Sequence, residues 1–214
     1  HKMEIHMQLD GAHGETVVAH LKSTMSMMTD NSGCSLLDTI CGRDTDGAGP
    51  GYEGEFKNDL RHGHGKETQS NGVVYEGEWK DGLRHGRGTC TYPNGEVYEG
   101  EFADGKRHGR GKETQSNGRV YEGEWRDDEV HGQGKCMWPD GEVYEGEWKN
   151  DQYHGHGKIT CPDRGVYEGE WEGGKPHGHG KSIFPGGAVY EGKFKYGMYH
   201  GHGTHASPNG YVYG

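Results

Sequence analysis

Histidine and carboxylate side chains are the groups in this chain whose types and spacing could do chemistry. The sequence holds 16 histidines, and pairs such as His154 and His156 stand two residues apart, so both would face one way on a strand. Equivalent histidines return 23 residues later, in strands about 10 Å away. Metal–nitrogen bonds of about 2 Å cannot bridge that distance. We therefore expect no specific metal site and no cofactor.

Pairs of glutamates such as Glu76 and Glu78 could act as acid and base, but the same pair returns in neighbouring segments. An active site is normally a unique exception to its scaffold, and this pair is not unique. Residues 49–54 match the letters GxGxxG, yet they precede an expected strand instead of joining a strand to a helix. No serine or cysteine lies in a nucleophile motif. The sequence therefore does not indicate an enzyme.

The elements that must position these side chains repeat with a fixed period. A tyrosine returns every 23 residues from Tyr52 to Tyr213 without insertion or deletion. Such periods mark stacked arrays in which each unit contacts only its neighbours. Hydrophobic residues make up only 29% of the chain and glycines number 42, so aromatic side chains must supply most of the burial. Function is therefore expected on the surface of the stack.

Each repeat contains two turn signals. Asp81-Gly82 is typical of a two-residue hairpin turn, and Pro93-Asn94-Gly95 marks a second turn. Two turns leave two strands in each repeat. The expected fold is all-β: an elongated, single-layer, twisted antiparallel sheet of stacked 23-residue β-hairpins, with a short N-terminal helical segment.

Counting outward from the first turn predicts the register of the hairpin. It places Gly77 opposite Gly86 and Glu78 opposite His85. Side chains alternate between faces along a strand, so aromatic and glycine residues share one face while glutamates and histidines share the other. A β-bulge near the His-Gly step would shift this register, and that alternative stays open.

The pattern YEGEW followed by HGxG, with a period of 23 residues, resembles the MORN (membrane occupation and recognition nexus) repeat family over residues 51–214. Residues 52–214 hold seven such units and the start of an eighth. The resemblance implies an elongated β array with a groove along it. It also implies non-catalytic roles: scaffolding, holding helical peptides and attachment near membranes. The seventh unit departs from the pattern, because Lys193 replaces the acidic residue opposite His200.

Residues 1–50 show no repeat. Apolar residues at helical spacing predict an amphipathic helix over about 15–29, and residues 43–51 read as a linker. The alternative is a poorly packed leader.

The leading functional hypothesis is a protein-interaction scaffold whose aromatic and glycine groove holds an extended or helical segment of a partner. The alternative role for the same aromatic side chains is to hold the sheet together. The candidate groove residues are Tyr52, Phe56, Tyr75, Trp79, Tyr98, Phe102, Tyr121, Trp125, Tyr144, Trp148, Tyr167, Trp171, Tyr190 and Phe194.

The second hypothesis is a peripheral membrane module that contacts anionic phospholipid headgroups. Its candidates are the basic columns Arg61, Arg84, Arg107, Lys66, Lys112, Lys135, Lys158 and Lys181. Interleaved glutamates dilute the positive field of these columns. An exposed sheet edge can pair with the edge of a second copy, so a homodimer is a further alternative.

Net charge and cysteine spacing limit the partners and the cellular location that the sequence suggests. The net charge of −11 weighs against nucleic acid as a partner. The five cysteines show no CxxC pair and no disulfide-scaffold spacing. We expect a cytoplasmic protein, associated with the cytoskeleton or peripheral to a membrane.

Overall fold

The computed structural model describes residues 2–5, 21–24 and 51–214, all of which lie in strands, turns or short connections. The first two segments, β1 (Lys2–Ile5) and β2 (Leu21–Thr24), pair as a two-stranded antiparallel sheet. The remaining fifteen strands, β3 to β17, follow one another in chain order as an open antiparallel sheet of hairpin repeats. The predicted all-β repeat fold is confirmed.

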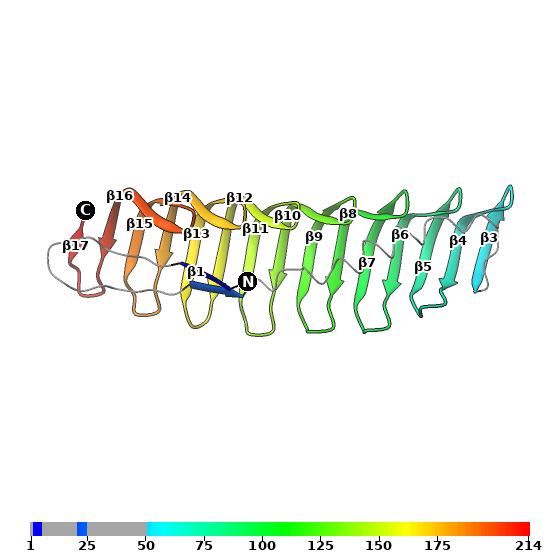
Figure 1. The fold of residues 1–214 in the computed structure, drawn as a ribbon, viewed down its shortest axis with the longest axis horizontal. Helices are drawn as coiled ribbons and strands as arrows, with labels where there is room; N and C mark the ends of the chain where they lie inside the picture. The colour runs from blue at the N-terminus through cyan, green and yellow to red at the C-terminus, as the bar shows by residue number, and fades with distance from the viewer. Residues whose placement is uncertain (1, 6–20, 25–50) are drawn as a thin grey trace. The chain divides into compact units, whose positions relative to one another are not determined.

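The repeats divide into two compact units, one ending at Pro139 and the other beginning at Asp140. The first unit contains β3 (Tyr52–Lys57), β4 (Leu60–Thr68), β5 (Val74–Lys80), β6 (Leu83–Thr91), β7 (Val97–Ala103), β8 (Lys106–Thr114), β9 (Val120–Arg126) and β10 (Glu129–Met137). The second contains β11 (Val143–Lys149), β12 (Gln152–Cys161), β13 (Gly165–Glu172), β14 (Lys175–Ile183), β15 (Val189–Lys195), β16 (Met198–Ala206) and β17 (Val212–Tyr213). Within each unit, Figure 1 shows successive hairpins side by side.

The predicted N-terminal helix overlaps the described residues only at Leu21–Thr24. These four residues form β2 and are therefore extended, not helical. The rest of the predicted helix lies outside the described residues, as does the predicted linker except for Gly51. Among the described residues, no helix has the length and hydrophobicity that crossing a bilayer requires.

The hairpin turns form where the sequence predicts them. Asp81 and Gly82 connect β5 to β6 with φ of 51° and 87°. Asp and Gly are among the residues that tolerate this left-handed conformation, which matches the twist of a hairpin. In the seventh repeat Tyr196 takes the same conformation, with φ of 53°.

The register of each hairpin is interrupted by a β-bulge at the His-Gly step. Next to the turn the predicted pairing holds, as with Glu101 opposite His108. Beyond the bulge, however, Gly77 pairs with Gly88, so the predicted pairing of Gly77 with Gly86 is wrong. Gly86 has φ of 58° and lies opposite Phe102 of the next hairpin. The bulge adds residues to one strand only, which is why counting equally from the turn fails.

Candidate partner-binding surface

The predicted groove residues form a ladder of edge-to-face aromatic contacts within each unit. Tyr75 contacts Trp79 of its own repeat and Phe102 of the next, with ring centroids 5.1 Å and 5.0 Å apart. In the second unit, Tyr167 contacts Trp171 and Phe194 in the same way. Such pairs stabilise by about 0.5–1.5 kcal/mol beyond their burial.

The polar atoms of these rings are satisfied inside the sheet. The Tyr98 hydroxyl donates to the Glu101 carbonyl oxygen over 3.0 Å, and Trp125 Nε1 donates to the Gly111 carbonyl oxygen over 3.3 Å. Burial raises the pKa of Tyr98 above its ordinary value. The buried Tyr98 side chain is thus a neutral hydrogen-bond donor.

Burial assigns the aromatic ladder a packing role. Phe56 is exposed and Tyr52 is half-buried, whereas the other candidates are buried. The buried candidates are Tyr75, Trp79, Tyr98, Phe102, Tyr121, Trp125, Tyr144, Trp148, Tyr167, Trp171, Tyr190 and Phe194. Direct partner contact by these side chains stays a prediction.

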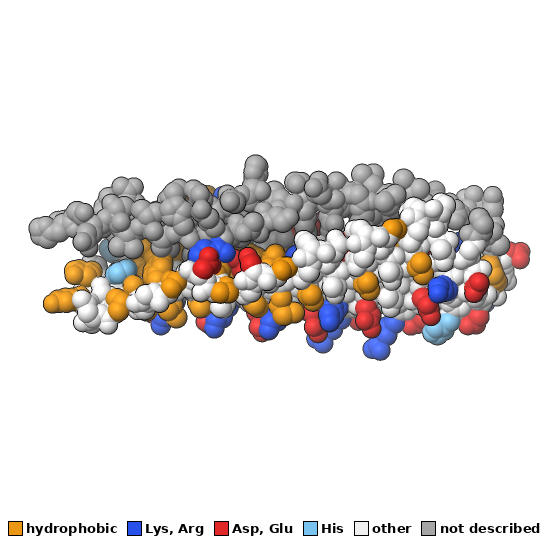
Figure 2. All heavy atoms as spheres, turned by 90° about the horizontal axis from the view of Figure 1, so that it is seen from below, with side chains coloured by type: hydrophobic (Ala, Val, Ile, Leu, Met, Phe, Trp, Pro, Cys, Tyr) orange, Lys and Arg blue, Asp and Glu red, His pale blue; other side chains and the backbone are white. Residues whose placement is uncertain are grey.

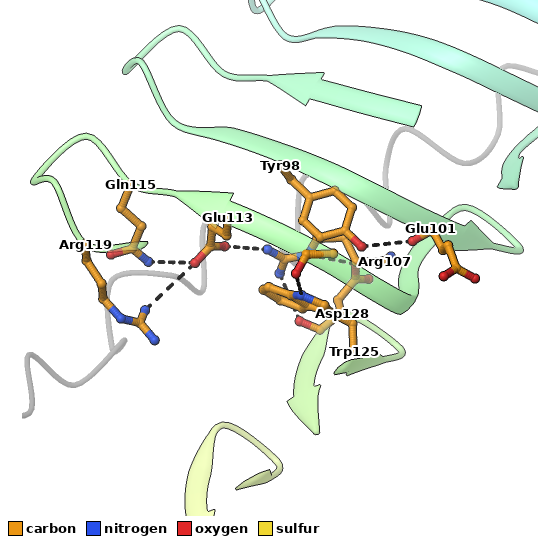
Figure 3. A network of polar contacts seen from close by, with 9 residues as sticks. Tyr98, Glu101, Arg107, Glu113, Gln115, Arg119, Trp125 and Asp128 are labelled. Atoms are coloured by element: carbon orange, nitrogen blue, oxygen red, sulfur yellow. Dashed lines mark hydrogen bonds and ion pairs between the residues drawn. The ribbon is translucent and has the colours of Figure 1, made fainter. Parts of the chain in front are cut away.

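Three candidate lipid-binding arginines, Arg61, Arg84 and Arg107, lie buried over the aromatic ladder. The Arg107 guanidinium lies 4.2 Å from the Trp125 ring centroid and bonds Glu113 over 2.7 Å and Asp128 over 3.3 Å. Figure 3 shows Glu113 between Arg107 and Arg119. This burial does not favour headgroup contact by the arginines, and the lipid prediction stays untested.

The acidic partners of these arginines were not among the residues predicted from the sequence. Glu67 and Glu113 stand fifteen residues after their repeat tyrosines and are buried beside Arg61 and Arg107. In both repeats the Arg and the Glu occur together, nine and fifteen residues after the tyrosine. This co-occurrence is the signal in the sequence that indicates the ion pair. The five candidate lysines, by contrast, are exposed: Lys66, Lys112, Lys135, Lys158 and Lys181.

The second unit builds the same layer from different side chains. Tyr153 replaces the arginine and stacks on Tyr144 with ring centroids 3.8 Å apart. In the same unit, the Cys161 thiol donates to Glu142 over 3.2 Å. Burial raises the pKa of Cys161 to about 12 and also raises the pKa of Glu142.

The hollows that the structure describes lie on the charged face. In the first unit, a hollow of about 760 Å³ has a floor of glycines and walls of exposed charged residues. Its lining is Arg87, Gly88, Thr89, Glu99, Gly100, Glu101, Arg110, Gly111, Lys112, Glu122, Gly123, Glu124 and Gln133. Figure 2 shows acidic and basic side chains alternating along one margin of the repeats.

The second unit has a corresponding hollow of about 1390 Å³. Its floor is again glycine, and its walls include Glu168, Lys158 and Lys181. Three exposed histidines, His156, His179 and His202, also line it. The ion pair between Lys158 and Glu168 in this hollow is long, at 3.7 Å, and exposed. It therefore leaves both side chains accessible.

The glutamates next to the bulge bind backbone amides. Glu101 lies opposite His108 as predicted, but its Oε1 accepts the Arg110 N–H over 3.1 Å. The same contact recurs in six repeats: Glu55 with His64, Glu78 with Arg87, Glu101 with Arg110, Glu124 with Gln133, Glu147 with His156 and Glu170 with His179. Each carboxylate thus satisfies a donor that the bulge removes from the ladder.

No group of three His, Cys, Asp or Glu side chains within the described part of the chain is arranged to hold a metal ion.

The fold and this site define an open array of β-hairpin repeats with a charged face. The family model for the MORN repeat matches residues 52–74, 75–97, 98–118, 121–143, 144–166, 167–189 and 190–210. The chain therefore belongs to the MORN repeat family. Comparison with curated protein sequences returns no match.

The solved structures that are similar to parts of this chain include two peptide complexes. One is the TCP domain of Drosophila melanogaster SAS-4 in complex with a proline-rich motif of Ana2: 13% identity, 76% of this chain, 88% of that chain, TM-score 0.45. The other is the TCP10 domain of Danio rerio CPAP with a peptide of STIL: 17% identity, 69% of this chain, 80% of that chain, TM-score 0.20. These TM-scores give no basis for transferring a binding site.

Proposed function

We propose that this chain is a non-catalytic protein-interaction scaffold whose charged face binds an extended or helical segment of a partner protein. The observation that carries the proposal is the glycine-floored hollow of the first unit, lined by exposed carboxylates and basic groups. The MORN repeats supply a regular support for that surface.

The spacing of the charges suits a helical partner. Glu99 lies opposite Lys112, and Lys112 lies opposite Glu122, so the sign of the charge alternates from strand to strand. Strands are about 4.8 Å apart, which brings like charges back after about 9.6 Å. An α-helix returns the same face after seven residues, about 10.5 Å. A helix with charged residues at heptad spacing therefore matches successive hairpins closely.

The aromatic ladder supports this surface from the opposite side of the sheet. Its edge-to-face contacts link each repeat to the next within a unit, while the backbone ladder sets the strand spacing on which the charge pattern depends. We assign partner contact to the charged face because most of the predicted aromatic contacts are buried.

The cellular setting remains part of the proposal. Among the described repeats, Cys90, Cys136 and Cys161 form no disulfide, which suits a reducing cytoplasm. Association with the cytoskeleton, contact with anionic phospholipid and dimerisation through a sheet edge stay predictions.

Charge reversal within the first hollow tests the proposal. The variant Arg110→Glu/Lys112→Glu reverses two exposed basic residues of the lining, while Lys106→Glu/Arg126→Glu makes the same charge change at exposed positions outside it. We expect the first variant to recover at least tenfold less of the proteins that the wild-type chain captures from native lysate. The second variant is expected to recover the same amount as the wild type. The measurement is quantitative mass spectrometry, with circular dichroism to verify folding. Equal recovery with both variants would contradict binding at the hollow.

A further inference from the structure

The carboxylate next to the bulge is a repeated structural part of the first six repeats. In the sixth, Glu170 Oε1 accepts the His179 N–H over 2.7 Å. The carboxylate also fills the space above the bulge glycine: a Cβ on Gly86 would lie 2.5 Å from Glu78 Cδ. Each of these bulges therefore contains an anion bound to a backbone amide.

The seventh repeat keeps the bulge but lacks the anion. Lys193 stands where the other repeats have glutamate, and its ammonium group has no lone pair with which to accept a hydrogen bond. Gly201 retains the left-handed conformation, with φ of 63°, and Gly192 still pairs with Gly203. The nearest atom to a Cβ on Gly201 would be Lys193 Cδ at 3.9 Å. The space filled by carboxylate elsewhere is thus open here.

We infer that the seventh bulge binds a carboxylate from an Asp or Glu side chain of the partner, at the place the internal glutamate takes in the other repeats. The incoming oxygen would accept the His202 N–H, as Glu170 Oε1 accepts the His179 N–H. This inference rests on the proposed scaffold function and adds the chemistry of one contact.

Charge and access both support the site. Lys193 is exposed, and His179 lies opposite it on β14. Lys181 and Glu191 line the hollow of the second unit, as does His179, and they pair with each other over 3.5 Å. The Lys193 ammonium puts a positive charge where the other repeats have a negative one, so it attracts a carboxylate. A hydrogen bond from an amide to an anion is also about twice as strong as one to a neutral acceptor. His202 itself lines the hollow of the second unit, so a partner segment lying there reaches the bulge.

Acetate is the smallest probe of this site. The ¹⁵N-labelled full chain is titrated with sodium acetate at constant ionic strength, and the backbone amide resonances are followed by NMR. We expect a saturable downfield shift of the His202 amide, at least threefold larger than that of the six amides already bonded to glutamate. A blocked peptide with a single Glu is expected to act likewise, and its Gln counterpart is not.

Two variants with the same charge change separate the site from general electrostatics. Lys193→Glu restores an internal carboxylate, so the His202 amide is expected to lie downfield from the start and to lose its response. Lys195→Glu alters an exposed residue nearer the turn of the same strand and is expected to retain the response.

Three outcomes would overturn the inference: an unsaturable His202 shift, a response that persists in Lys193→Glu, or a response to inorganic phosphate but not to acetate. Each would leave the scaffold proposal standing, because that proposal is tested by Arg110→Glu/Lys112→Glu in the first unit.

Discussion

The paired glycines are the residues on which the packing of each hairpin depends. A Cβ on Gly100 would lie 2.5 Å from Gly111 Cα and 2.5 Å from the Tyr98 hydroxyl oxygen. Tyr98 is fully buried, and its hydroxyl is bonded to the backbone of the same strand. Glycine is required here because both the neighbouring backbone and the tyrosine ring occupy the space of a side chain.

Replacing this glycine should therefore be costly. We expect Gly100→Ala to lower the free energy of unfolding by about 3 kcal/mol, since neither the strand nor the ring can retreat freely. Gly186→Ala provides the control: a Cβ there meets no atom within 4 Å, and we expect a change within about 0.5 kcal/mol. Urea unfolding followed by tryptophan fluorescence measures both. Equal losses would show that the close approach is not what requires glycine.

At the scale of the strands, buried ion pairs connect neighbouring hairpins in the first unit. Arg84 on β6 bonds Glu67 on β4 over 3.3 Å, and Arg61 on β4 bonds the same carboxylate. Arg84 also lies over the Tyr75 ring, 4.8 Å from its centroid. The buried Glu67 carboxylate therefore links the arginines of two successive repeats.

Removing one arginine should leave that carboxylate short of positive charge. We expect Arg84→Met to destabilise the fold by about 2 kcal/mol, because Glu67 stays buried with one partner fewer. Lys66→Met breaks an exposed pair, Lys66–Glu76 at 3.8 Å, and is expected to cost no more than about 0.5 kcal/mol. Denaturant midpoints of the two variants provide the comparison. A Lys66 variant as unstable as the Arg84 variant would argue against a special role for the buried pair.

At the scale of the whole molecule, the same tyrosine environment recurs along the array. Burial raises the pKa of the repeat tyrosines Tyr75, Tyr98, Tyr144 and Tyr167 above the ordinary value of 10.0. Between the ordinary and the raised pKa, the folded chain holds protons that the unfolded chain releases. The contribution of these tyrosines to the free energy of unfolding is therefore fully present below pH 10 and falls as the pH rises above 10.

This repetition predicts a steep alkaline unfolding transition. Each buried tyrosine should contribute a loss of about 1.4 kcal/mol per pH unit above pH 10. Tyrosinate absorbance at about 295 nm should rise together with the loss of β-sheet circular dichroism, and Tyr144→Phe should make the transition less steep. Ionisation of these tyrosines while the β-sheet signal persists would contradict their burial.

Much of the fold was predictable because its determinants are local and repeat. The 23-residue spacing from Tyr52 to Tyr213 and dipeptides such as Asp81-Gly82 specify hairpins and turns without long-range information. The opposition of Trp79 and Arg84 next to the turn also follows from simple counting. These features depend on backbone geometry within a single repeat.

The tertiary structure alone decided the register beyond the bulge and the roles of the two faces. Glu101 binds the Arg110 amide across the hairpin, and this side chain-to-backbone bond is invisible to a rule of alternating faces. Likewise, a carboxylate two strands away makes Arg84 a buried structural residue. Which charges are buried and which remain open to a partner depends on contacts between repeats, and such contacts exist only once the strands have paired.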